Sequence, residues 1–75
     1  MTLIELKARQ QAKIKAIAGP ETLRRRLVAL GVLTGSQVSV AATSLLGNPR
    51  IYCIGKQQIC LRSAEAGHIE VELPS

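Results

Sequence analysis

Residues that could bind a metal ion are few in this chain. The soft ligands are two cysteines and one histidine: Cys53, Cys60 and His68. If residues 50–61 form a hairpin, the two thiols are diagonal neighbours on one face, where a metal or redox site is conceivable. Two thiols and a distant imidazole are an incomplete ligand set, however, and small strand residues explain the cysteines equally well. We therefore predict no metal site and no cofactor.

The composition offers equally little for catalysis. The 75 residues include no aspartate, five glutamates, one histidine and one asparagine. Acid–base or nucleophilic chemistry needs several such groups at one place. The chain has no glycine-rich phosphate-binding loop, so nothing supports a GTPase activity. We predict that the chain is not an enzyme.

Charge is distributed unevenly along the chain. Residues 1–62 contain ten cationic and two acidic side chains, a net charge of +8, whereas residues 63–75 contain three glutamates and have a net charge of −3. A basic surface could meet a phosphate backbone, an anionic membrane, an acidic protein face or only solvent. A single aromatic residue, Tyr52, provides too little stacking surface for single-stranded nucleic acid.

The densest cationic run is Arg24, Arg25 and Arg26. It lies in a segment that begins at Pro20-Glu21 and ends before Gly31, and the leucine spacing predicts a helix there. The buried stripe of this helix is predicted to be Leu23, Leu27 and Leu30. The three arginines then form a solvated face, a docking site for an acidic protein, with Arg26 best placed for docking, or a contact for a nucleotide.

Adjacent leucines, Leu45 and Leu46, begin a loop that continues as Gly47-Asn48-Pro49. They either fold back as a lid over the core or form an exposed anchor for a protein interface. Leu33, in the turn after the helix, could join such an anchor. We expect the anchor to be ringed by three cationic side chains, Arg24, Arg50 and Arg62.

Alternating apolar and polar residues predict five short strands, at residues 11–18, 36–42, 50–54, 57–61 and 69–73. Gly55-Lys56 suits a two-residue type II′ turn, and Ser63 is expected to cap a short helical turn through Ala66. The predicted core residues are Ala12, Ile14, Ala16, Ala18, Val38, Val40, Tyr52, Ile54, Ile59, Leu61, Ile69, Val71 and Leu73.

The 8.0 kDa mass fits one domain, residues 1–75. Five antiparallel strands hide their edges best by curling into a small barrel. We predict a mainly β fold, a five-stranded barrel with one short α-helix between the first and second strands. The charged N-terminus is unlike a signal peptide and no apolar run could span a bilayer, so we expect a cytoplasmic protein.

Several motifs occur in an order that resembles one family. They are LRRRLVALGVLTGSQV at residues 23–38, LGNP at 46–49, ICLRSAEA at 59–66 and IEV at 69–71. Together they resemble the ferrous iron transport protein A family, FeoA, over about residues 3–73. The resemblance implies an SH3-like barrel in the bacterial cytoplasm and a membrane partner, the FeoB transporter with its GTP-binding cytoplasmic domain.

The chain departs from the family pattern at a few positions. Ala8-Arg9 replaces a frequent Pro-Gly, which puts the geometry of the opening turn in question because arginine reaches positive φ less easily than glycine. Thr34 replaces a proline, and Asn48 stands where aspartate is usual. The fold assignment does not depend on these positions.

Two functions follow from these patterns. The first is a non-enzymatic accessory protein that binds and modulates the FeoB-type transporter, touching the membrane only through that partner. The alternative is a small basic barrel that binds nucleic acid or accompanies an iron-dependent repressor. The expected partner-binding residues are Arg24, Arg25, Arg26, Leu33, Leu45, Leu46, Asn48, Arg50 and Arg62.

Overall fold

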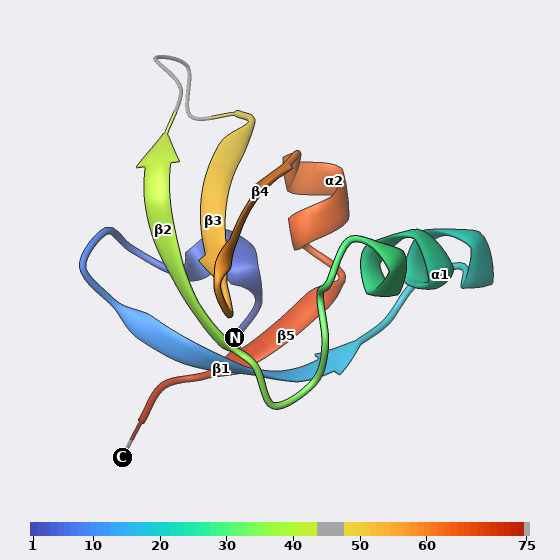
Figure 1. Ribbon diagram of the computed structural model, residues 1–75, viewed down its shortest axis with the longest axis horizontal. Helices are drawn as coiled ribbons and strands as arrows, with labels where there is room; N and C mark the ends of the chain where they lie inside the picture. The colour runs from blue at the N-terminus through green and yellow to red at the C-terminus, as the bar shows by residue number, and fades with distance from the viewer. Residues whose placement is uncertain (44–47, 75) are drawn as a thin grey trace.

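The computed structural model describes residues 1–43 and 48–74. A strongly curled, antiparallel five-stranded sheet dominates it (Figure 1). The elements in chain order are η1 (Leu3–Glu5), β1 (Gln11–Ile17), α1 (Glu21–Ala29), β2 (Gln37–Thr43), β3 (Arg50–Ile54), β4 (Gln57–Leu61), α2 (Ser63–Ala66) and β5 (Ile69–Glu72). The predicted five strands, with the helix between the first and second, are confirmed.

The strands are ordered β4-β3-β2-β1-β5. Within the described ranges no ladder joins β4 to β5, so strand pairing alone does not close the barrel. Residues 1–6, which we call the N-terminal segment, cover the β5 edge instead. Thr2 bridges to Glu70, and the Val71 N–H donates to the Met1 carbonyl oxygen at 2.8 Å. This segment also fills the core, since Leu3 and Leu6 are fully buried.

The β3–β4 hairpin has the register that the sequence predicts. Tyr52 pairs with Ile59, and Ile54 pairs with Gln57. Gly55 has a φ of +62°, whereas the φ of Lys56 is not positive. A type II′ turn requires a positive φ at the first of its two central residues only. The inward side chains of the hairpin are buried as expected: Tyr52, Ile54, Ile59 and Leu61.

An irregularity in β1 changes which side chains face the core. The pairing of β1 with β5 shifts between Ile14 and Ala16, so the alternation of faces is reset there. Ala16 and Ala18 are consequently exposed, and Ile17 packs against the core. The prediction that both alanines point inward was wrong because it assumed an unbroken strand.

The α1 helix contacts the core through a narrower stripe than predicted. Leu27 is fully buried and Leu23 is half-buried, but Leu30 is 40% exposed. The helix ends at Ala29, and Gly31 with a φ of +100° turns the chain back. Fully buried Val32 takes the place expected for Leu30, and its N–H donates to the Leu27 carbonyl oxygen at 2.9 Å.

The C-terminal part differs from the prediction in two details. Arg62, not Ser63, is the N-cap of α2, and its N–H donates to Oε1 of Glu65 at 3.0 Å. Leu73 lies beyond the end of β5 and is 42% exposed, so it does not belong to the core. Among the helices of residues 1–43 and 48–74, none is long and apolar enough to cross a membrane.

The opening turn keeps a left-handed residue without a glycine. Arg9 has a φ of +72°, and the turn is closed by the Gln10 N–H, which donates to the Lys7 carbonyl oxygen at 3.1 Å. The geometry that the sequence put in question is therefore retained, at the steric cost of a Cβ in this region.

We predict that Arg9→Gly raises the free energy of unfolding by roughly 0.5 to 1 kcal/mol. Removing the Cβ relieves about 1 to 2 kcal/mol of steric cost, and part of that gain is lost to the greater unfolded-state entropy of glycine. Urea denaturation measures the change. Lower stability than the unsubstituted chain would show that the turn is not strained.

We predict that Leu27→Ala lowers the free energy of unfolding by about 2 to 5 kcal/mol, because it leaves a cavity between α1 and the core. Arg25→Ala, on the solvent side of the same helix, is the matched control and should change it by less than about 0.5 kcal/mol. Equal denaturation midpoints for both variants would contradict this packing.

Candidate functional site

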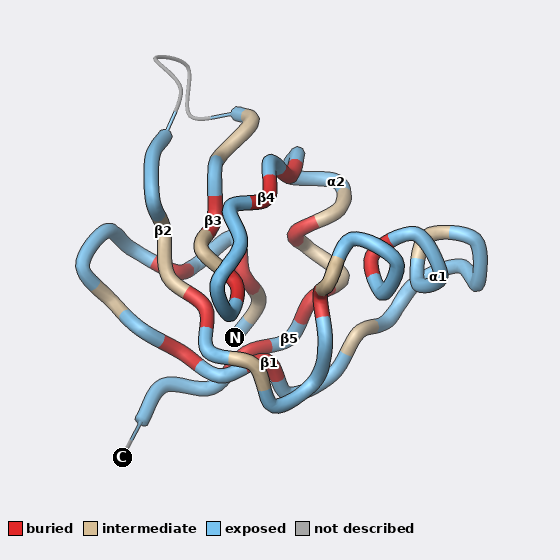
Figure 2. The backbone as a smooth tube through the Cα atoms, viewed as in Figure 1, coloured by how far each residue is buried: buried red, intermediate tan, exposed pale blue. Residues whose placement is uncertain are grey.

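The outer face of α1 is an exposed surface that combines cationic and apolar side chains. Figure 2 shows that most of this helix is solvent-exposed, and Figure 1 shows that it stands out from the sheet. A shallow hollow of about 450 Å³ runs along it. We call this surface the α1 outer face and define it by the residues that line the hollow, Glu21, Arg24, Arg25, Val28 and Ala29.

Val28 gives the α1 outer face an apolar centre, because its side chain is 49% exposed. Arg25 donates to Oε1 of Glu21 at 2.6 Å, one helical turn away. Both side chains are largely exposed, so this pair adds little stability. Arg24 forms no ion pair within residues 1–43 and 48–74, so its charge is available to an acidic partner.

Arg26 has an intramolecular role that its position in the sequence did not reveal. Its guanidinium forms an ion pair with Oε2 of Glu65, which joins α1 to α2. The Glu65 side chain is 12% exposed, and its other oxygen accepts the Arg62 N–H. Arg25 and Arg26 are thus both paired within the chain, whereas Arg24 is the one of the three arginines without an ion pair among the described residues.

Arg50 holds the N-terminal segment in place. Its Nη1 donates to the carbonyl oxygens of Leu6 at 2.9 Å and Ile4 at 3.2 Å. The Tyr52 hydroxyl donates to the Leu3 carbonyl oxygen at 3.4 Å, from the same strand. These bonds connect β3 with the segment that completes the core, so Arg50 has a structural role whatever else it binds.

The remaining predicted partner residues that the structure describes do not all line one hollow. Asn48 accepts the Ser63 N–H at 3.0 Å, and together with Arg50 it lines a hollow near η1 and α2. Arg24 lines the separate hollow on α1. Leu33 is 50% exposed, Arg62 is exposed, and Leu45 and Leu46 lie outside the described residues.

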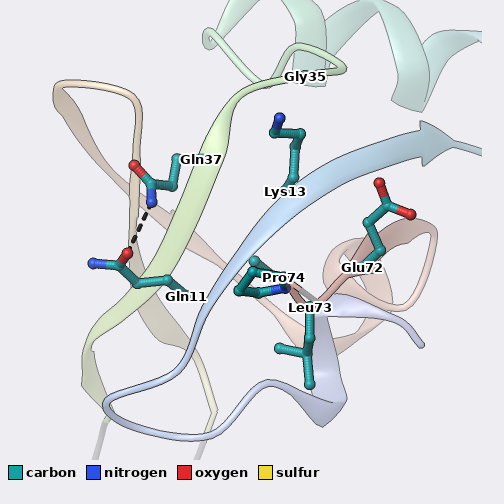
Figure 3. Close-up of a pocket in the computed structure, with 8 residues that line it drawn as sticks. Gln11, Lys13, Gly35, Gln37, Glu72, Leu73 and Pro74 are labelled. Atoms are coloured by element: carbon teal, nitrogen blue, oxygen red, sulfur yellow. Dashed lines mark hydrogen bonds between the residues drawn. The ribbon is translucent and has the colours of Figure 1, made fainter.

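Another hollow, of about 550 Å³, lies between the β1–β2 ladder and the C-terminal residues (Figure 3). Gln37 donates to Gln11 at 2.8 Å across its floor. Lys13 and Glu72 face each other on paired strands, so the cation and the carboxylate balance within it. Its lining residues contain no thiol, imidazole or hydroxyl group, and nothing in them suggests a reaction centre.

Comparison with known proteins gives the family. The FeoA domain model matches residues 1–73. The chain belongs to the FeoA family. A fusion of Fe(2+) transport protein A with the Fe(2+) transporter FeoB, from Porphyromonas gingivalis, is 35% identical over all 75 residues. The chain spans only 9% of the length of that fusion protein.

Solved structures of FeoA proteins share the fold. The iron(II) transport protein A of Clostridium thermocellum is similar with a TM-score of 0.91 at 34% identity, over 97% of this chain and 45% of that one. The Stenotrophomonas maltophilia FeoA, described as a prokaryotic SH3 domain protein, has a TM-score of 0.81 at 29% identity, over 96% of this chain and 89% of that one. The predicted SH3-like fold is confirmed.

The cysteines keep the arrangement that the predicted hairpin register gives them. Cys53 is opposite Gln58 and Cys60 is opposite Ile51, so the two are diagonal on the outer face of the hairpin. Cys53 is half-buried, Cys60 is exposed and both are free thiols. The part of the chain that the structure describes holds no group of three or more histidine, cysteine or acidic side chains that could bind a metal.

Sequence reasoning missed one member of the α1 outer face, Val28, and one contact of a predicted residue, the ion pair of Arg26 with Glu65. Val28 follows buried Leu27 directly, so it lies about 100° from the leucine stripe and faces solvent. An apolar residue at that angle was a readable signal. The engagement of Arg26 with Glu65 was not readable, because the two residues are 39 positions apart and meet only through the packing of α1 beside α2.

We predict that Arg50→Met lowers the free energy of unfolding by about 1.5 to 3 kcal/mol, because two carbonyl oxygens of the N-terminal segment lose a charged donor. Arg62→Met, an exposed cation next to α2, is the control and should stay within about 0.5 kcal/mol. Chemical denaturation measures both. Equal losses would contradict the structural role assigned to Arg50.

Proposed function

We propose that this FeoA-family chain is a cytoplasmic, non-enzymatic accessory of ferrous iron uptake that binds the cytoplasmic side of a FeoB-type transporter and modulates it. Membership of the family supports a role in ferrous iron transport. The observation that supports a FeoB-type partner is the Porphyromonas gingivalis fusion, in which Fe(2+) transport protein A and the transporter FeoB share one polypeptide. A partner so joined in one organism is a natural binding partner for a separate chain in another.

The α1 outer face is the proposed docking surface. It combines exposed Val28 with the available charge of Arg24, and truncation of a central apolar side chain typically has the largest effect on an interface. Arg25 becomes available when its weak surface pair with Glu21 opens. The expected partner surface is therefore an acidic patch around an apolar pocket.

Arg26 and Leu33 are two further predicted partner residues on or near α1. Arg26 would have to leave Glu65 before it could bind a partner, and Arg26→Glu would place two carboxylates together at the α1–α2 contact. A substitution of Arg26 therefore changes both the stability of the fold and the affinity for a partner, and a binding experiment alone does not separate the two effects. Leu33 at 50% exposure extends the apolar surface beyond the end of the helix.

We predict that Val28→Ser weakens binding to the purified cytoplasmic domain of the FeoB-type transporter by more than about 1 kcal/mol, roughly fivefold in Kd, while stability changes by less than about 0.5 kcal/mol. Titration calorimetry measures the affinity. Leu73→Ser, at a similarly exposed leucine, is the matched control and should bind normally. Normal binding by Val28→Ser would remove the α1 outer face from the interface.

The salt dependence separates the proposal from nucleic-acid binding, to which the net charge of +5 also points. Arg24→Glu should weaken binding to the transporter domain, and the effect should shrink as salt rises. Lys56→Glu, at the hairpin turn, is the charge-matched control. Tight binding to DNA or RNA that falls steeply with salt, with no binding to the transporter domain, would favour the alternative function.

A further inference from the structure

A second hollow, of about 240 Å³, lies where the N-terminal segment, the far end of β2 and the start of α2 approach β3. Its rim carries polar groups over an apolar floor that includes buried Leu61. The polar groups are those of Thr43, Asn48, Arg50 and Ser63. The proposed docking surface on α1 is separate from this hollow. Asn48 and Arg50, which the sequence predicts to bind the transporter, here line a site for a different ligand.

Arg50 is fixed in orientation at this hollow and has donors to spare. A guanidinium has five N–H bonds, two of them on Nη1. Nη1 is directed at the carbonyl oxygens of Leu6 and Ile4, so the three N–H bonds on Nη2 and Nε have no acceptor among the described residues. Because the side chain is already held, a ligand would lose little affinity to ordering it.

The charge of Arg50 is not balanced nearby. The ion pairs of the described residues join Arg25 to Glu21 and Arg26 to Glu65, and no acidic residue lines this hollow. The hollow between the β1–β2 ladder and the C-terminal residues differs in this respect, because there Lys13 is opposite Glu72. A half-buried cation whose only partners are neutral oxygens attracts an anion strongly.

The other polar groups also present hydrogen-bond donors. Oδ1 of Asn48 accepts the Ser63 N–H, which leaves the Nδ2 hydrogens of Asn48 for another acceptor. The hydroxyl groups of Thr43 and Ser63 can donate as well. The volume is below the range of about 300 to 1,000 Å³ typical of drug-sized ligands, so it suits one small group rather than a nucleotide.

We propose that this hollow is a carboxylate-binding pocket, with Arg50 as the bidentate partner and Asn48, Thr43 and Ser63 as supporting donors. An ionised carboxylate is planar, accepts only, and matches the guanidinium fork. The carboxylate belongs either to a free small acid or to an acidic side chain of a bound protein. Because all the donors named here belong to described residues of this chain, the proposal does not depend on the transporter.

The test is a titration of the ¹⁵N-labelled chain with sodium acetate, followed by NMR and compared with sodium chloride at the same ionic strength. Acetate should give saturable shifts at Arg50 Nε and the Asn48 side-chain amide, with a Kd on the order of 1 to 10 mM for so small a ligand. Chloride should not. Identical responses to the two salts, or tighter binding of inorganic phosphate than of acetate, would overturn the proposal.

Variants confirm the location without removing Arg50. Thr43→Val keeps the shape of the side chain, and it should raise the acetate Kd by about fivefold through the loss of one donor. Thr34→Val, an exposed threonine outside the hollow, is the matched control and should leave the Kd unchanged. Equal affinities for the two variants would overturn the assignment of the pocket.

A pair of short peptides distinguishes the two sources of the carboxylate. The capped peptides Gly-Glu-Gly and Gly-Gln-Gly differ only in the charged group. Stronger binding of the glutamate peptide than of acetate, at the same resonances, assigns the pocket to a protein side chain. Binding of acetate with exclusion of both peptides assigns it to a free acid. Failure of all three ligands to bind would overturn the proposal while leaving docking through the α1 outer face intact.

Discussion

The fold depends on how the open side of a five-stranded sheet is filled. β4 and β5 are the outer strands, and a small sheet with aliphatic residues on its inner face needs cover for both its edges and its core. The N-terminal segment supplies both, since Met1 and Thr2 bond to β5 while Leu3 and Leu6 are fully buried. Arg50 donates to its Leu6 and Ile4 carbonyl oxygens, and the Tyr52 hydroxyl is a second donor to the Leu3 carbonyl oxygen, which also accepts the Leu6 N–H. The N-terminal segment is thus held to both β5 and β3.

This constraint divides the arginines by function. Arg50 is needed by the N-terminal segment, and Arg26 joins α1 to α2 through Glu65, so neither charge is simply a surface charge. Arg24 remains exposed on a helix that rests on the sheet chiefly through Leu27. A short helix that packs through so narrow a stripe leaves most of its surface to a partner, and this is the physical basis for assigning docking to the α1 outer face.

Local patterns predicted the strands, the hairpin register and the β-turn at Gly55, because alternation and turn chemistry act over a few residues. The predictions failed where distant parts of the chain compete. The shifted pairing in β1 exposed Ala16, and the early end of α1 replaced Leu30 with Val32 in the core. Likewise, the arginine run was found from sequence, but which arginine is free depends on contacts such as that between α1 and α2, which no local pattern encodes.

We propose that the transporter binds the α1 outer face and leaves the hairpin free. Amide NMR of the ¹⁵N-labelled chain, recorded while the cytoplasmic domain of the FeoB-type transporter is added, tests it most directly. The account predicts that shifts and line broadening concentrate on residues 21–29, while the resonances of the β3–β4 turn at Gly55 keep their positions apart from general broadening. Unchanged spectra, or changes centred on the hairpin with α1 unaffected, would contradict it.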